Sequence, residues 1–196
     1  MMKKIRHLMI TALCASILIL TSPCSIRGET GTMLSADTLA DMCLYTTLED
    51  PYPAFVQISL TESLNYIKNG KTGILIFTGP WCPYCQYAVP VLNEALKEAG
   101  TFALLIDPLE YDQDTEAGAF KELSDLFKTV WGTHEDNTII NVPEVIAVKN
   151  GTIAGHHYEL LDTFAKDEVD SGAEMSAEQK EELKKIYADL IRLTRE

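Results

Sequence analysis

Two cysteines separated by only two residues are the part of this sequence best suited to chemistry. They are Cys82 and Cys85, in the stretch GPWCPYCQYAVP that covers residues 79–90. The thiolate is the reactive form of cysteine, and a free cysteine has a pKa of about 8.5. A pair at this spacing is found in three kinds of site: a redox couple, half of a zinc site, or a structural disulfide.

The position of the pair favours redox chemistry. An apolar run at residues 73–78, GILIFT, predicts a buried strand that ends shortly before Cys82, and the residues after Cys82 have helical spacing. The start of a helix has unpaired backbone N–H groups and the positive end of the helix dipole, which stabilise a thiolate. Cys85 falls on the same side of the first turn and can reach the Cys82 sulfur. We therefore expect Cys82 to attack the disulfide of a partner and Cys85 to resolve the mixed disulfide.

The rest of the sequence disfavours the other two kinds of site. A zinc site needs two more ligands, and the sequence has no second C-x-x-C and no H-x-x-x-H pattern. A structural disulfide across two intervening residues closes a very small loop and constrains the unfolded chain little. We expect no metal and no organic cofactor, because the electrons would come from a redox partner protein.

The other three cysteines do not form a second pair of this kind. Cys14 lies inside an apolar N-terminal segment, and Cys24 lies at its edge. Cys43 is therefore the odd cysteine of the folded part. So few cysteines in a domain of this size are not a disulfide scaffold. We expect Cys43 to be a small buried apolar side chain, with a third redox thiol as the lesser alternative.

The N-terminus predicts export. A basic start precedes thirteen residues, 8–20, that carry no charge. This length fits a secretory signal better than a membrane span, which needs about 18 or more apolar residues. Residues 1–28 are therefore predicted to be a signal peptide or an N-terminal membrane anchor. Lipidation at Cys24 is an alternative, although Pro23 stands where a small residue is expected, and no A-x-A cleavage site follows.

The charge of the remaining chain argues against nucleic acid as a partner. Residues 29–196 carry 12 basic and 29 acidic side chains, a net charge of −17. Such a surface repels a phosphate backbone, and no basic patch with aromatic residues interrupts it. The acidic residues are expected to form a solvated surface.

The pattern of apolar residues predicts an α/β domain over residues 51–196. Residues 29–50 are interpreted as a linker followed by a weak N-terminal helix, which ends before Pro51. Asn150-Gly151 joins two strand-like runs and predicts a hairpin, and Ser176 with Gln179 predicts a capping box at the start of the last helix. The expected strands cover residues 55–58, 73–78, 102–106, 142–148 and 151–158, and helices are expected at 61–69, 83–99, 120–131 and 177–191.

These motifs together resemble the thioredoxin family. The resemblance is carried by WCPYC at residues 81–85, by Pro90 eight residues after the first cysteine, and by VPEV at residues 142–145 followed by VKNG at 148–151. It covers the chain from about residue 55 to the C-terminus. It implies a thioredoxin-like fold, in which helices flank a central mixed β-sheet, with an inserted helix before the strand that follows Pro143.

The resemblance also implies the parts of a site. Pro143 would be cis and lie against the cysteines, so that the backbone of Val142 can pair with an extended segment of a substrate protein. Trp81, Pro83 and Tyr84 would form an apolar rim around the Cys82–Cys85 redox-active disulfide. The implied function is thiol–disulfide oxidoreductase activity on protein thiols and disulfides. The N-terminal segment, and not the resemblance, predicts that this activity is extracytoplasmic, in a secreted or membrane-anchored protein.

The chain departs from the family pattern in three places. Thioredoxins keep a buried aspartate on the strand before the motif, and Ile76 occupies that position here. Glu159 stands where a glycine usually follows the last strand. The stretch between Ile106 and Asn141 is longer than in a minimal thioredoxin, which is similar to membrane-linked and bacteriocin-export accessory members. The alternative function is therefore a binding or accessory module with little redox activity.

Overall fold

A computed structural model describes residues 40–131 and 140–196, apart from the side chains of 129–131. The predicted signal peptide or anchor at residues 1–28 lies outside the described residues. Within the described ranges, no helix combines the length and the hydrophobicity that crossing a membrane requires.

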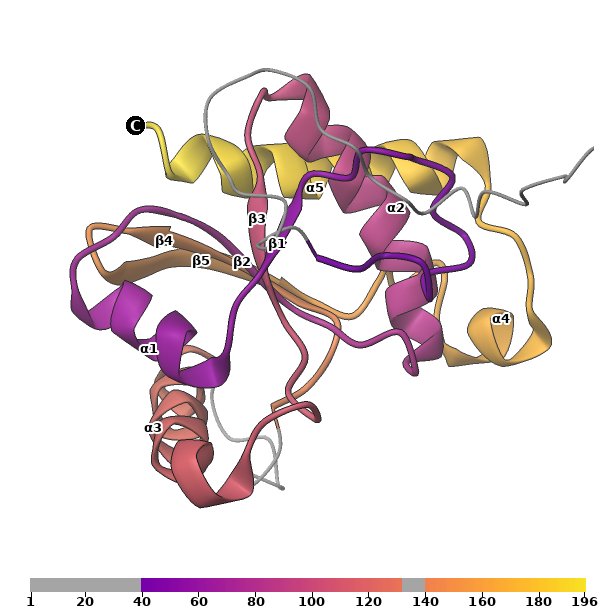
Figure 1. Ribbon diagram of the computed structural model, residues 1–196. Helices are drawn as coiled ribbons and strands as arrows, with labels where there is room; N and C mark the ends of the chain where they lie inside the picture. The colour runs from indigo at the N-terminus through magenta and orange to yellow at the C-terminus, as the bar shows by residue number, and fades with distance from the viewer. Residues whose placement is uncertain (1–39, 132–139) are drawn as a thin grey trace, which may run out of the picture.

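Five strands form one mixed sheet at the centre of the molecule (Figure 1). In sequence order they are β1 (Phe55–Gln57), β2 (Gly73–Phe77), β3 (Ala103–Ile106), β4 (Glu144–Lys149) and β5 (Thr152–Tyr158). Their order in the sheet is β1-β3-β2-β4-β5. The first three strands are parallel, whereas β4 is antiparallel to both β2 and β5. The predicted mixed sheet is therefore confirmed.

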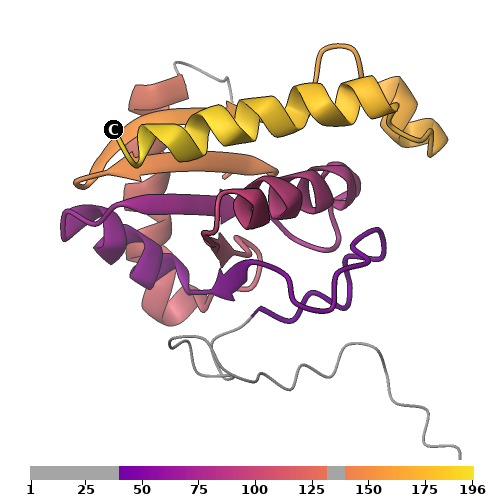
Figure 2. The same cartoon turned by 90° about the horizontal axis from the view of Figure 1, so that it is seen from above.

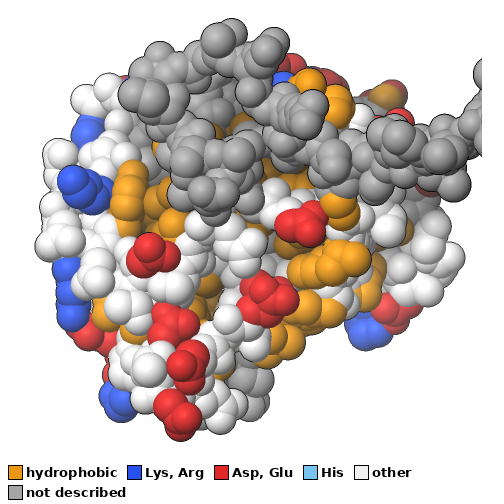
Figure 3. Space-filling view, viewed as in Figure 1, with side chains coloured by type: hydrophobic (Ala, Val, Ile, Leu, Met, Phe, Trp, Pro, Cys, Tyr) orange, Lys and Arg blue, Asp and Glu red, His pale blue; other side chains and the backbone are white. Residues whose placement is uncertain are grey.

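Helices cover both faces of the sheet. α2 (Pro83–Glu98) and α5 (Ala177–Leu193) pack together on one face, and α1 (Leu60–Lys68) and α3 (Gln113–Trp131) pack on the other (Figures 1 and 2). Residues alternate between the two cores along β2: Ile76 joins the core under α2 and α5, and Phe77 joins the opposite one. Because both faces are buried, the strand has the continuous apolar sequence noted above. Figure 3 shows acidic side chains gathered over α3.

Local sequence signals account for several element ends. Ser59 and Ser176 form capping boxes with Glu62 and Gln179, the second of which was predicted. The predicted hairpin is also confirmed, because β4 ends at Lys149 and β5 begins at Thr152, with Asn150 and Gly151 both at positive φ (49° and 74°). A short helix, α4 (Lys166–Ser171), was not predicted and packs near α2.

The predicted N-terminal helix is wrong over the described residues of its range. Residues 40–50 form turns and irregular chain instead of a helix. Ala40, Met42 and Tyr45 are buried in the core under α2 and α5, so packing against that core overrides a weak helical pattern. We call residues 40–53 the N-terminal strap. The prediction for Cys43 is wrong too, since this residue is exposed and disulfide-bonded, in a bond that does not involve the free thiols Cys82 and Cys85.

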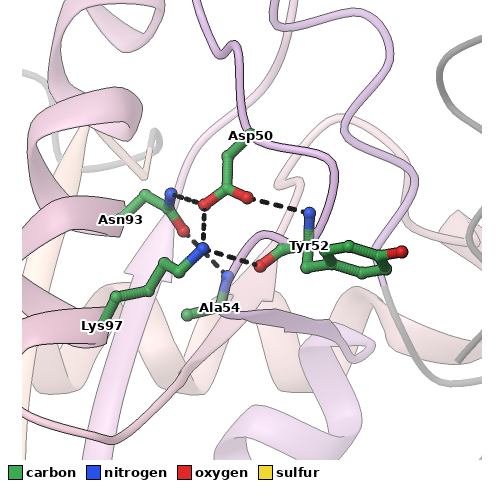
Figure 4. Close-up of polar contacts among 5 residues, drawn as sticks. All are labelled: Asp50, Tyr52, Ala54, Asn93 and Lys97. Carbon is green, nitrogen blue, oxygen red and sulfur yellow. Dashed lines mark hydrogen bonds and ion pairs between the residues drawn. The ribbon is translucent and has the colours of Figure 1, made fainter. Parts of the chain in front are cut away.

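One end of the N-terminal strap is held to α2 by a buried amide and a carboxylate (Figure 4). Asp50 Oδ2 accepts hydrogen bonds from Asn93 Nδ2 (2.7 Å) and from the Lys97 ammonium, and Asp50 Oδ1 accepts one from the Tyr52 N–H (2.9 Å). Asn93 Oδ1 in turn accepts the Ala54 N–H at 2.8 Å. This network fixes the chain just before it enters β1.

The middle of the N-terminal strap is held near the first turns of α2. Gln86 Nε2 donates to the carbonyl oxygens of Leu44 (3.1 Å) and Pro80 (2.8 Å). The Thr47 hydroxyl donates to the Gln86 carbonyl. That carbonyl has no helical donor, because Pro90 stands four residues later and has no N–H. The proline inside α2 therefore leaves an acceptor that the strap satisfies.

We expect Asp50→Ala to destabilise the protein by about 1–3 kcal/mol at pH 7, because it removes charge-assisted hydrogen bonds and leaves the buried Asn93 amide N–H without its acceptor. Burial alone would raise the pKa of Asp50, but hydrogen bonds from Lys97, Tyr52 and Asn93 outweigh it and lower that pKa. The stabilisation is therefore present above the unfolded pKa of about 3.9 and is lost as the pH falls through the lower folded value.

Urea unfolding of wild type and variant, followed by circular dichroism at neutral and acidic pH, tests this expectation. The difference in unfolding free energy should narrow toward acid. Glu174→Ala, which removes an exposed carboxylate elsewhere, is the control and should leave stability nearly unchanged. An Asp50→Ala penalty that does not depend on pH would contradict the expectation.

Candidate active site

Cys82 stands at the junction of β2 and α2. It is the N-cap residue of α2, with extended backbone angles (φ −90°, ψ 118°), and Pro83 is the first helical residue. The Cys82 sulfur accepts a hydrogen bond from the Cys85 N–H at 3.2 Å. An N-cap side chain normally satisfies one of the unpaired N–H groups of the first turn, and here a sulfur does so. The location expected from the sequence thus gives the Cys82 thiolate a backbone donor.

The two thiols of the pair differ in their ionisation. Both are free and buried, with 4% of Cys82 and 0% of Cys85 exposed. The pKa of Cys82 is lowered by a hydrogen bond from the Cys85 side chain, against the opposing effect of burial, and by backbone N–H groups of residues 85 and 84. Burial raises the pKa of Cys85, and the neighbouring Cys82 raises it further. Cys82 is therefore the thiol that ionises first.

The Val142–Pro143 segment lies against this pair. The peptide bond between the two residues is cis, as the resemblance implied. The Val142 carbonyl oxygen is 3.8 Å from the Cys82 sulfur, within hydrogen-bonding distance for a thiol. Pro143 is buried, and its carbonyl accepts the Glu159 N–H at 3.0 Å. The tertiary structure thus brings together two predicted parts of the site that lie 60 residues apart.

An aspartate that the sequence analysis missed supports the tryptophan beside the pair. Trp81 is 50% exposed, and its indole N–H donates to both carboxylate oxygens of Asp107 (3.2 and 3.1 Å). Asp107 is 7% exposed and also accepts the Leu109 N–H at 2.9 Å. The sequence feature that could have indicated this contact is an acidic residue directly after the apolar strand β3. Because β2 and β3 are parallel neighbours, the end of β3 lies beside the end of β2, which leads to Trp81. The negative charge of Asp107 raises the pKa of Cys82, against the stronger lowering effects.

The other two predicted rim residues differ in exposure. Pro83 is exposed, whereas Tyr84 is partly buried and packs against the core under α2 and α5. Within the described ranges, no group of three or more His, Cys, Asp or Glu side chains is placed to hold a metal ion.

Two of the departures from the family pattern are visible in the structure. Ile76 is fully buried in the same core as Cys85, so an apolar side chain fills the position where an acid was expected from the resemblance. Glu159 has a φ of 62°, in the left-handed region that favours glycine. A non-glycine residue there keeps a backbone conformation that a glycine adopts more easily.

Comparisons with known proteins give a limited likeness. No protein-family model and no curated protein matches the chain. A thioredoxin from Plasmodium falciparum is 19% identical, with a TM-score of 0.36, and the match covers 60% of this chain and 98% of that one. Thioredoxin O2 from Arabidopsis thaliana is 17% identical, with a TM-score of 0.39 and coverage of 62% and 96%. Thioredoxin O1 from the same plant is 20% identical, with a TM-score of 0.36 and coverage of 60% and 96%.

The fold is thioredoxin-like on the strength of its own geometry. The sheet has the order β1-β3-β2-β4-β5, helices flank both faces, the cysteine pair opens α2, and a cis proline precedes β4. The helix predicted before that proline is α3, which begins seven residues earlier than expected, at Gln113.

We expect iodoacetamide to modify Cys82 well before Cys85 in the reduced protein. The rate should have its midpoint below the value of about 8.5 for a free cysteine, because the N-terminal turn of α2 stabilises the thiolate. Peptide mass spectrometry across a pH series measures both sites. Cys82→Ser is the control and should remove the fast phase. Equal labelling of the two cysteines would contradict the assignment.

Asp107→Asn should shift the Cys82 midpoint to a lower pH. The substitution removes a negative charge that raises the pKa of Cys82, while the amide oxygen can still accept the Trp81 N–H. The same alkylation series measures the shift. Asp114→Asn, at an exposed position in the first turn of α3, is the matched control and should leave the midpoint in place. An unchanged midpoint in Asp107→Asn would show that this charge does not act on Cys82.

Proposed function

We propose that this chain is a thiol–disulfide oxidoreductase that exchanges disulfides with other proteins through Cys82 and Cys85. The observation that carries the proposal is the split between the two thiols. One sulfur caps α2 and ionises readily, and the other is buried directly behind it with a raised pKa. A nucleophile beside a resolving thiol is the arrangement that disulfide exchange requires.

The exchange proceeds in two steps. The Cys82 thiolate attacks one sulfur of a substrate disulfide, which forms a mixed disulfide and releases the other substrate sulfur as a thiolate. Cys85 then loses its proton and attacks the Cys82 sulfur, which forms the Cys82–Cys85 disulfide and releases the second substrate thiolate. Two electrons pass from the dithiol to the substrate, and the Cys85 proton ends on a released thiolate. In the opposite direction, the same steps oxidise a substrate dithiol.

The proposed substrate platform is the backbone at Val142, whose carbonyl faces the Cys82 sulfur. An extended segment of a substrate protein can pair there by strand addition, which places its sulfur against Cys82. Trp81 and Pro83 are exposed next to the buried sulfur and would contact the same segment. Leu109, 65% exposed and linked through Asp107 to Trp81, extends this apolar rim.

We propose an extracytoplasmic location for this activity, on the strength of the apolar N-terminal segment of the sequence. The partners would be protein thiols and disulfides, and a redox protein that restores the pair. The direction of electron flow depends on the reduction potential of the pair relative to its compartment.

A Cys85→Ser variant should trap substrate proteins as mixed disulfides on Cys82, because the resolving thiol is gone while the nucleophile remains. Cys82→Ser should lose both trapping and turnover. Non-reducing electrophoresis and reduction of insulin disulfides measure these outcomes.

The discriminating control is the double variant Cys82→Ser/Cys85→Ser, which keeps the remaining cysteines and sets the background of the assay. If Cys82→Ser reduces insulin at the wild-type rate, the proposal is wrong. If the wild-type pair never cycles in a glutathione redox buffer, a binding or accessory module would be the better interpretation. The apolar Ile76 at the acid position is the observation that favours that second function.

A further inference from the structure

The resolving step poses a problem for this chain that the proposed function leaves unanswered. Cys85 must become a thiolate to attack Cys82, yet its side chain is fully buried. Burial penalises the charged form of a thiol. The position where a buried carboxylate was expected is filled by Ile76, so some other buried polar group must stabilise the charge.

Thr78, the residue directly after β2, is the buried polar side chain that acts on Cys85. It lies on the same face of the strand as Ile76, and it is fully buried. Burial and the neighbouring Cys82 raise the pKa of Cys85, and hydrogen bonding from the Thr78 hydroxyl and from the Gly79 backbone N–H lowers it, so both groups favour the thiolate. The Thr78 backbone N–H donates to the Ile106 carbonyl at 2.9 Å, so the position of the residue is fixed by the sheet.

Tyr45 completes this group of buried hydroxyls from outside the sheet. Its hydroxyl oxygen lies 3.1 Å from Thr78 Oγ1, and only 3% of the residue is exposed. Burial raises the pKa of Tyr45, so the phenol keeps its proton across the physiological range. When Tyr45 donates to the Thr78 oxygen, the single Thr78 hydrogen is left to point at the sulfur. Hydrogen bonds in such a chain polarise and strengthen one another.

We propose that Thr78 is a catalytic residue of the resolving step and that Tyr45 is its positioning residue, the two hydroxyls taking the place of a buried carboxylate. This inference rests on the proposed function, because it concerns the second step of the exchange. As Cys85 gives up its proton, which ends on the thiolate released by the substrate, the Thr78 O–H donates to the developing sulfur charge. The Cys85–Cys82 bond then forms and the Cys82–substrate bond breaks.

The N-terminal strap is what delivers Tyr45 to this place. Hydrogen bonds from Gln86 to the Leu44 carbonyl and from Thr47 to the Gln86 carbonyl hold the strap on both sides of Tyr45. The strap therefore has a chemical role besides covering the core. The minimal βαβ framework around the cysteines would lack this hydroxyl.

The test separates the two steps with dithiobis(nitrobenzoate), an aromatic disulfide, and the reduced full chain in a stopped-flow instrument. The first release of coloured thiol reports attack by Cys82, and the second reports attack by Cys85. Thr78→Val should slow the second phase about tenfold, as for loss of one hydrogen bond to a charged group, and move its pH midpoint upward. Tyr45→Phe should slow it about threefold, with a smaller shift in the same direction. The first phase should stay within about twofold of wild type in both variants.

Three further proteins make the result specific. Thr78→Ser keeps the hydroxyl and should restore most of the second-phase rate. Tyr87→Phe removes a hydroxyl on α2 that donates to the Ala173 carbonyl, away from Cys85, and should leave both phases unchanged. In the double variant Tyr45→Phe/Thr78→Val, the second phase should be no slower than in Thr78→Val alone, because Tyr45 acts only through Thr78.

The outcomes distinguish this inference from the proposed function. If the wild-type protein releases no second thiol, the pair does not form its disulfide and the proposed function fails. If wild type releases both thiols but Thr78→Val has a wild-type second phase and pH midpoint, the proposed function stands and the hydroxyl inference is overturned. Equal slowing of both phases would also overturn it, since it would indicate a general structural change.

Discussion

The hydrogen bond from the Cys85 N–H to the Cys82 sulfur is the interaction on which the rest of the site depends. It exists because only four residues separate the end of β2 from the N-cap of α2, so the chain turns from sheet to helix at the cysteine. The helix can hold that position because its apolar side packs against the sheet and α5. A backbone donor at the start of a helix is a fixed partial charge, and it acts on whichever side chain stands at the N-cap.

Burial then separates the two thiols from each other. A low-dielectric surrounding raises the cost of charge on both sulfurs. At Cys82 hydrogen bonds from the Cys85 side chain and from two backbone N–H groups outweigh that cost, whereas at Cys85 the hydrogen bonds from Thr78 and from the Gly79 backbone do not. Asp107 works against the low pKa of Cys82 through its charge, while its hydrogen bonds hold Trp81. The same carboxylate therefore has a structural benefit and an electrostatic cost.

The N-terminal strap links the site to a part of the chain outside the βα framework. It contacts α2 at Gln86, whose carbonyl has no helical donor, and at Asn93, whose side chain is buried. Tyr45 lies between Leu44 and Thr47, the two strap residues that are bonded to Gln86, and its hydroxyl reaches Thr78. Changes in the strap are therefore expected to be felt at Cys85 as well as in stability.

The sequence by itself determined the local features. Continuous apolar runs predicted the buried strands, Asn150-Gly151 predicted the hairpin, and Ser176 with Gln179 predicted the last capping box, because each depends on residues close together in the chain. The cysteine pair at a strand-to-helix junction was also predicted, for the same reason.

Only the tertiary structure decided the contacts that join distant segments. Trp81 and Asp107 are 26 residues apart, Tyr45 and Thr78 are 33 apart, and the strap contact of Asp50 with Asn93 spans 43. The local sequence pattern does not specify such pairs. Each pair forms because the packing of distant elements places two polar groups next to each other away from solvent. For the same reason a weak helical pattern in the strap gave way to packing against the core, where burial outweighs the small differences of helix propensity.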